Sequence, residues 1–295
     1  MSEITLLAEV TAFLRQPHGQ FIAGQREAGR GAPFAVINPA TGRAIAEVTA
    51  ADSDQADRAM ESARQAFSQW REMPTLARGA LLLKLADTLA EHREALAQLE
   101  SLCSGKTITL ARMLELDQSV AFLRYFAGWA GKVTGETLDV SLPSMAGEKY
   151  TAFTRRQPLG VVVGIVPWNF SIMIAIWKLA AALVCGCTID KVLRLIQTAR
   201  DEGDTIVCGG EALPGEGYFL QPTAVKVRSE ESTLMRDQAL RYSEAIEAGI
   251  VWVNMHTFLD PAVPFGGMKG SGIGREFGSA FIDDYTELKS VMVRY

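Results

Sequence analysis

The chain has 295 residues, of which 48% are hydrophobic, and it carries a formal net charge of -5. This length allows two domains with ordinary cores, and the acidic balance excludes the clustered basic charge that a nucleic-acid or anionic-membrane partner requires. The four cysteines are too few for a disulfide framework, so we expect a cytoplasmic protein in a reducing compartment.

The N-terminal third predicts short strands followed by long helices. Residues 19–50 alternate apolar and polar side chains around turn-forming pairs, which is typical of short strands. Ser53 is then expected to cap a helix whose apolar residues recur three and four positions apart as far as Phe67. Two further amphipathic helices are predicted, from about residue 77 to 105 and from 114 to 135.

An apolar run in the middle of the chain predicts a buried parallel strand. Residues 161–166, VVVGIV, are apolar on both faces, as in a strand covered by helices on each side. Pro167 ends the strand, and Asn169 follows in the turn at its carboxyl edge, where ligands bind in open α/β sheets. Asn169 has two possible roles: it caps the helix that starts at Ser171, or its amide donates a hydrogen bond to an oxyanion.

The apolar stretch 159–189 does not predict a membrane span, because PWNF divides it and Lys178 interrupts its second half. After it we expect a helix over 191–202 and strands within 204–210, 215–227 and 246–254. The chain should end in a strand that includes ELKSVMVRY. Helices between strands predict an α/β protein with a parallel sheet.

Several motifs together point to one family. They are NPATG at 38–42, PWNF at 167–170, AIWKLAAALVCGCT at 175–188, YFLQPT at 218–223, GIVWVN at 249–254 and PFGGMKGSGIGRE at 264–276. In this order the motifs resemble the NAD-dependent aldehyde dehydrogenases. The segment IEAGIVWVNMHTFLDPAVPFGG is most similar to the bacterial phenylacetaldehyde dehydrogenases.

The resemblance implies an α/β fold in three parts. A Rossmann-type cofactor domain would comprise residues 1–136 and 157–190, and an α/β catalytic domain would comprise residues 191–283. Residues 137–156 and 284–295 would form the strands of a β arm. Family members pair such arms to form homodimers or homotetramers, which covers otherwise exposed strand edges.

The chain departs from the family pattern at two places. After Ile189 the family continues with a lysine that meets the cofactor ribose, the rest of the Rossmann sheet, a glutamate base and the nucleophilic cysteine. The second departure lies at 234–246, where the family holds the nicotinamide ribose and ring. We therefore expect an internally truncated aldehyde dehydrogenase that lacks the catalytic cysteine and glutamate and is inactive alone.

Three interpretations of the truncation remain open. The missing segments exist outside this chain, or the chain is an inactive oligomeric scaffold, or it is a degenerate remnant that does not fold alone. Loss of most of a parallel sheet would expose several hundred Å² of apolar surface, which costs on the order of 10 kcal/mol. This cost favours the first interpretation.

The reaction implied by the resemblance is oxidation of an aldehyde to the carboxylic acid by NAD(P)⁺ through a cysteine thioester. By resemblance, Asn169 donates a hydrogen bond to the oxyanion, and NAD is the cofactor, with NADP left open. The cofactor cleft would be lined by Ile165, Pro167 and Trp168. The substrate tunnel would be lined by Phe170, Ile174, Trp177, Phe258, Leu259 and Phe265.

The same aromatic spacing also fits a plain core, but together with the family motifs it favours a tunnel for an aromatic, phenylacetaldehyde-like substrate. No cysteine of the chain is expected to act as nucleophile, because none has a neighbouring base, and no metal site is expected.

Overall fold

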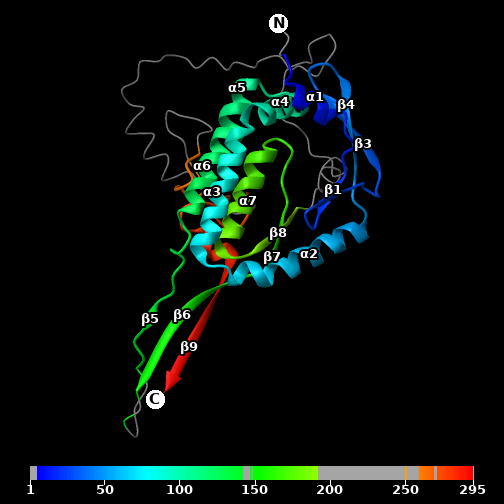
Figure 1. Cartoon of the computed structure of the whole chain (residues 1–295). Coiled ribbons are helices and arrows are strands. Elements are labelled where there is room, and N and C mark those ends of the chain that lie inside the picture. Colours follow the sequence, from blue (N-terminus) through cyan, green and yellow to red (C-terminus); the bar gives the residue numbers. More distant parts are fainter. Residues whose placement is uncertain are drawn as a thin grey trace, which may run out of the picture.

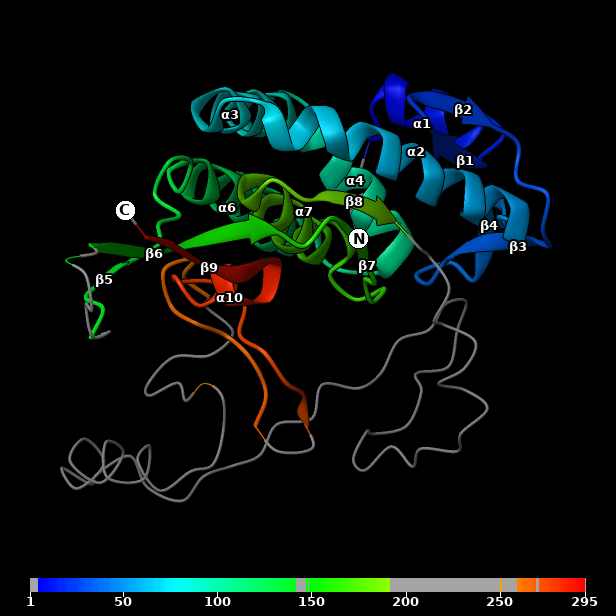
Figure 2. The ribbon, with the colours of Figure 1, turned by 90° about the horizontal axis from the view of Figure 1, so that it is seen from below.

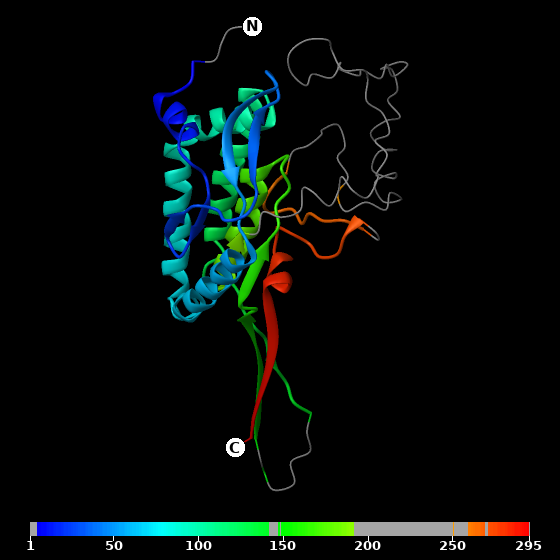
Figure 3. The same cartoon turned by 90° about the vertical axis from the view of Figure 1, so that its right-hand side faces the viewer.

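The structure, a computed structural model, describes residues 5–141, 147, 149–191, 250, 259–268 and 271–294. A body of packed helices carries the N-terminal strands on one side, and a long antiparallel arm projects away from it (Figures 1 and 3). The carboxyl end of the chain lies at the far end of this arm.

The N-terminal strands form two small antiparallel hairpins, as the alternating pattern predicted. After the helix α1 (Ala8–Leu14), β1 (Gln20–Ile22) pairs with β2 (Gln25–Glu27). β3 (Pro33–Asn38) then pairs with β4 (Arg43–Thr49).

The first long helix, α2 (Ser53–Glu72), begins with a capping box. The carboxylate of Asp52 accepts a hydrogen bond from the Gln55 N–H at 2.8 Å, and Gln55 bonds back to the Asp52 N–H. The expectation that Ser53 caps the helix is therefore wrong by one residue, since Asp52 has the extended backbone of a cap and Ser53 is already helical. Gln55 is fully buried and also donates to Glu27, which attaches the helix to β2.

Replacing Asp52 with alanine should lower the free energy of unfolding by about 1 kcal/mol, because the Gln55 N–H would lose its acceptor. Ser53→Ala is the matched control, since it removes a neighbouring polar group that does not cap. Urea unfolding of the two variants measures the difference. Equal losses in both variants would show that the capping box does not stabilise the helix.

The two further predicted helices are divided in the structure. The first becomes α3 (Thr75–Glu91) and α4 (Arg93–Ser104), which meet at His92, whose backbone leaves the helical region. The second, predicted from 114 to 135, corresponds to the end of the π-helix η1 (Ala111–Asp117) and to α6 (Gln118–Ala127), with the short α5 (Ile108–Leu110) before them. The helix ends at Ala127, so the prediction was too long at its carboxyl end. The apolar spacing continues through these breaks, so periodicity alone does not reveal them.

The helix α7 (Ser171–Cys185) lies at the centre of the body and packs against α3, α6 and α10 (Phe281–Tyr285) (Figure 2). Its buried face belongs to a core that draws side chains from all four helices. The fully buried aromatic residues of this core are Phe122, Phe126, Phe277 and Phe281. Within the described ranges, the helices are too short or too polar to cross a membrane.

The predicted parallel strand forms one half of a β-α-β unit. β7 (Val161–Gly164) pairs in parallel with β8 (Thr188–Lys191), and α7 connects them. Gly186, with φ of 92°, ends α7 in a left-handed conformation that other residues rarely adopt. β7 ends three residues before Pro167, and Lys191 is still in a strand, so the helix predicted over 191–202 does not begin there. Its remaining residues, and the strands predicted within 204–254 apart from Ile250, lie outside the described residues.

The arm is a three-stranded antiparallel sheet in the order β5 (Thr137–Leu138), β6 (Tyr150–Pro158) and β9 (Thr286–Arg294). β6 and β9 pair without interruption from Tyr150 opposite Arg294 to Pro158 opposite Thr286. The final strand of the chain is thus confirmed, and it pairs with a strand that lies far earlier in the sequence.

Candidate active site

The carboxyl end of β7 leads into an exposed turn that carries the predicted cofactor residues. Ile165 is 46% exposed and Trp168 is 66% exposed, and Pro167 between them is also exposed. Large apolar side chains that are exposed at the carboxyl end of a parallel strand mark a surface on which a ligand can bind. The structure therefore brings these three residues to one edge.

Asn169 follows in the same turn, and its side chain is exposed. The N-cap position of α7 is occupied by Phe170, and no side chain caps the helix locally. Within the described residues, the Asn169 amide has no hydrogen-bond partner. The capping role left open by the sequence is therefore not observed, and the amide is free to donate to a ligand.

The predicted substrate residues converge on one aromatic cluster. Trp177 is buried in the core, and the partly buried side chains that pack against this core include Phe170, Ile174, Leu259 and Phe265. The rings of Trp177 and Phe265 lie 6.1 Å apart between centroids, although their residues come from segments far apart in the sequence. Phe258 lies outside the described residues.

Phe277 joins this cluster and was missed by sequence reasoning. Its ring centroid lies 4.7 Å from those of both Phe122 and Trp177, and it stacks on Phe265 at 5.8 Å. The residue has φ of 70°, which is rare for a bulky side chain and costs on the order of 1–3 kcal/mol. Packing on three sides holds Phe277 in this conformation, so it fixes the relative position of the two predicted tunnel residues.

An ion pair connects the same two segments beside the aromatic cluster. Lys178 of α7 pairs with Glu276 at 2.7 Å, and the backbone of Glu276 forms two hydrogen bonds of 2.8 Å with Phe265. Both charged side chains are about three-quarters buried. Lys178 stood out in the sequence as a charge within an apolar helix. Because a largely buried charge needs a partner, a lysine at this position indicates an ion pair with a distant residue.

The described cysteines do not have the environment of a nucleophile. Burial raises the pKa of the Cys185 thiol to about 12, and the nearby Cys187 adds to this effect. Burial also raises the pKa of Cys187, whose thiol donates to the Tyr285 carbonyl at 3.3 Å. Nucleophilic cysteines need a lowered pKa, so these two thiols are unsuited to attack. Cys103 is exposed, and Cys208 lies outside the described residues.

Among the residues that the structure describes, there is no group of three histidine, cysteine, aspartate or glutamate side chains that could hold a metal ion.

Comparison with known proteins identifies the family of the chain. The model of the aldehyde dehydrogenase family matches residues 26–190 and 232–291. A phenylacetaldehyde dehydrogenase of Pseudomonas fluorescens is 26% identical over 486 residues, which cover 96% of this chain and 97% of that protein. Retinal dehydrogenase 2 of Gallus gallus is 42% identical over 501 residues, which cover 100% of this chain and 95% of that protein.

A solved structure, the NAD⁺ complex of an aldehyde dehydrogenase from Bacillus cereus, is similar with a TM-score of 0.85 and 25% identity over 99% of both chains. The two sequence alignments are much longer than the 295 residues of the chain, so long stretches of each relative have no counterpart in it. Residues 191–231, between the two matched ranges, begin where the sequence predicted the first missing block. The fold is therefore the α/β fold of these enzymes, and the chain belongs to the aldehyde dehydrogenase family.

Proposed function

We propose that the chain binds an aromatic aldehyde and stabilises the oxyanion formed when that aldehyde is oxidised to the carboxylic acid through a cysteine thioester. The observation that carries this proposal is the free amide of Asn169, exposed at the carboxyl end of β7 and next to the aromatic cluster. Attack of a thiolate on an aldehyde places negative charge on the carbonyl oxygen. A pre-positioned amide donor stabilises that charge.

The substrate class follows from the aromatic cluster. Phe170, Trp177 and Phe265 offer large apolar faces, which suit a ring on the aldehyde. The similarity to the phenylacetaldehyde dehydrogenase of Pseudomonas fluorescens supports phenylacetaldehyde as the first compound to test.

The cofactor of the proposed reaction is NAD or NADP. The exposed apolar side chains of Ile165, Pro167 and Trp168 fit the flat rings of a dinucleotide, and a parallel strand edge is where such ligands bind. When bound, NAD(P)⁺ supplies the hydride acceptor. The chain's own contribution is to provide the apolar surface of Ile165, Pro167 and Trp168 on which the ligand packs.

We assign the nucleophile and the general base to segments that this chain does not contain. The raised pKa values of Cys185 and Cys187 support this assignment, as does the length of the alignments to relatives. The free cysteines support a reducing, cytoplasmic location. The three-part domain division proposed from the sequence, with residues 137–156 and 284–295 as arm strands, is supported by the pairing of β5, β6 and β9.

The alternative function is a catalytically inactive scaffold that forms homodimers or homotetramers through the arm. The exposed apolar side chains of Leu288 and Met292 on β9 favour it, because an arm that stays isolated would leave them in water.

The first test combines a mass with an assay. The natural polypeptide is weighed intact, and NADH formation is followed with phenylacetaldehyde and NAD⁺. A mass near 32.1 kDa without activity would overturn the enzymatic proposal and leave the scaffold. A larger mass with activity would support an enzyme whose remaining segments lie outside this chain.

In the active protein, Asn169→Ala should lower kcat by about 10²–10³-fold, because one oxyanion donor is lost. Asn38→Ala is the control, since the Asn38 side chain accepts a hydrogen bond from the Ala40 N–H in the turn between β3 and β4. A loss of kcat that is equally small in both variants would exclude Asn169 as the oxyanion donor.

A further inference from the structure

The start of α7 lacks a local cap, although a helix start leaves four backbone N–H groups without partners inside the helix. Phe170 at the N-cap has no side-chain acceptor, and the Asn169 amide is not used. The N–H groups of this first turn therefore need acceptors from elsewhere in the fold, because unsatisfied buried donors are costly.

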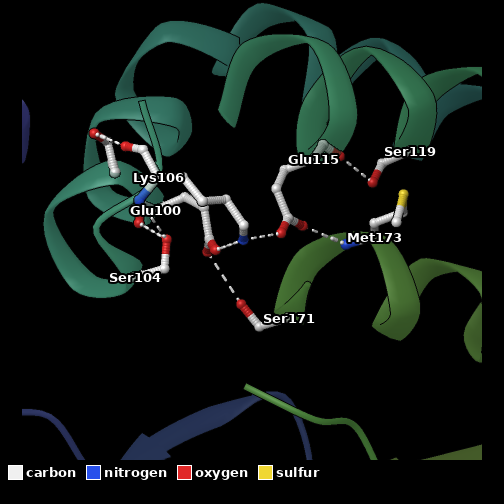
Figure 4. Close-up of polar contacts among 8 residues, drawn as sticks. Glu100, Ser104, Lys106, Glu115, Ser119, Ser171 and Met173 are labelled. Carbon is white, nitrogen blue, oxygen red and sulfur yellow. Dashed lines mark hydrogen bonds and ion pairs between the residues drawn. The ribbon is translucent and has the colours of Figure 1, made fainter. Parts of the chain in front are cut away.

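Glu115 supplies one such acceptor from another helix. Its Oε2 accepts a hydrogen bond from the Met173 N–H at 2.9 Å (Figure 4). Met173 is the third residue of α7, which is the position that a capping side chain normally satisfies. Glu115 is fully buried in the π-helix η1, and its negative charge lies at the positive end of α7.

Lys106 balances this buried charge and links it to a second carboxylate. Its ammonium group lies between Glu115 and Glu100 and pairs with both, at 2.5 Å from Glu100 (Figure 4). The other oxygen of Glu100 accepts a hydrogen bond from the Ser171 hydroxyl at 3.0 Å. The same ammonium lies 4.6 Å from the centre of the Phe170 ring.

Three consecutive contacts thus hold the residues that directly follow Asn169. Phe170 is held by Lys106, Ser171 by Glu100, and the first turn of the helix by Glu115. Since the carboxylate of Glu115 accepts from the first turn of α7, the acceptor oxygen of the Asn169 side chain is not engaged as a cap.

We propose that Glu115 and Lys106 are positioning residues for Asn169. The Glu115 carboxylate, which belongs to η1, caps the start of α7, and the Lys106 ammonium group holds that carboxylate in place. Together they keep the Asn169 side chain out of the helix cap and hold its turn in one position. This inference rests on the proposed role of Asn169 as the oxyanion donor. Neither residue needs to touch the aldehyde for this role.

The test follows backbone and side-chain amides of the full chain by NMR, without substrate. In Glu115→Ala the Met173 amide should exchange its hydrogen at least roughly tenfold faster, because a charge-assisted hydrogen bond is lost. In Glu115→Gln the side-chain oxygen can still accept, so protection should largely remain. The Met173 amide proton should nevertheless shift upfield, because a neutral acceptor bonds more weakly than a carboxylate.

Glu94→Ala is the matched control. Glu94 also joins α4 to η1, through two hydrogen bonds from Arg112, and it accepts a third from Gln98 of α4, whereas Glu115 bonds α7 directly. The Asn169 side-chain amide signal should shift or broaden in Glu115→Ala and stay unchanged in Glu94→Ala.

Three results would overturn the inference. Equal acceleration of exchange across all helices in Glu115→Ala and Glu94→Ala would mean that Glu115 affects only overall stability. A response at Met173 without one at Asn169 would mean that the cap does not position the amide. An unchanged Met173 shift in Glu115→Gln would exclude the hydrogen bond itself, even if the alanine variant fails to fold. Failure of the proposed function would instead appear as an absence of activity, or of an Asn169→Ala effect, and would leave these signals unaltered.

Discussion

Replacing Lys106 with methionine should lower the free energy of unfolding by about 3–5 kcal/mol, because it leaves two buried carboxylates without their counter-charge. The side chains of Glu115 and Glu100 are 0% and 6% exposed, so water cannot solvate the charge that remains. Methionine retains the length and most of the volume of lysine, so the loss reports the charge rather than a cavity. Urea unfolding at neutral pH measures it, with exposed Lys84→Met as a control that should change stability by less than about 0.5 kcal/mol.

The loss of stability in Lys106→Met should depend on pH, and the titration of the Glu115 carboxyl sets the direction of that dependence. Burial raises the pKa of this carboxyl, and the hydrogen bonds from Lys106 and the Met173 N–H offset only part of that effect. A carboxyl group whose pKa is raised in the folded state stabilises the fold at pH values below its unfolded-state pKa of about 4.3. This contribution is lost as the pH rises through its folded-state pKa. Without Lys106 the pKa should rise further, so the deficit should be smallest near pH 4, about the unfolded pKa, and should grow toward neutral pH. A deficit that is constant with pH would exclude a charge effect.

Phe122→Ala should lower the free energy of unfolding by about 3–5 kcal/mol, since it removes a large ring from the centre of the core. Phe122 is fully buried, and its ring lies 5.3 Å from Trp177 and 4.7 Å from Phe277. The packing of Trp177 and Phe277 should also loosen, because the rings around Phe277 hold it in a strained backbone conformation.

Phe21→Ala is the control for this core substitution. Phe21 is 71% exposed, so its truncation should change stability by less than about 0.5 kcal/mol. Thermal unfolding and the fluorescence of the tryptophans report stability and packing together. Similar losses for the two phenylalanines would contradict a core centred on Phe122.

The local structure of the N-terminal half was largely predictable from the sequence. Alternating apolar residues and turn pairs marked the four strands of residues 19–50, and helical spacing marked α2. The helix start was missed by one residue, because Asp52 and Ser53 are both good caps and only the backbone conformation distinguishes them. The break at His92 was missed because a single non-helical residue leaves the apolar spacing almost intact.

The site was predictable only in part. The PWNF turn and Trp177 of α7 were found through family motifs, and the turn lies at the carboxyl end of β7, where a ligand-binding edge is expected. The network of Lys106, Glu100 and Glu115 was not found, because charged residues in amphipathic helices usually face solvent. Its contacts join residues far apart in the sequence, Ser171 with Glu100 at 71 positions and Met173 with Glu115 at 58 positions, which no local pattern encodes.

The pairing of β6 with β9 has a consequence for how the length of the chain can change. Pro158 lies opposite Thr286, and the Leu159 N–H bonds the Tyr285 carbonyl at 3.3 Å, so the polypeptide leaves the arm and returns to it at one point. Residues 159–285 thus form a segment whose two ends are brought together by the pairing of β6 with β9. The entropic cost of closing such a segment grows only by roughly 0.6 kcal/mol for each doubling of its length. This segment can therefore change in length at a small entropic cost while the pairing of β6 with β9 stays the same.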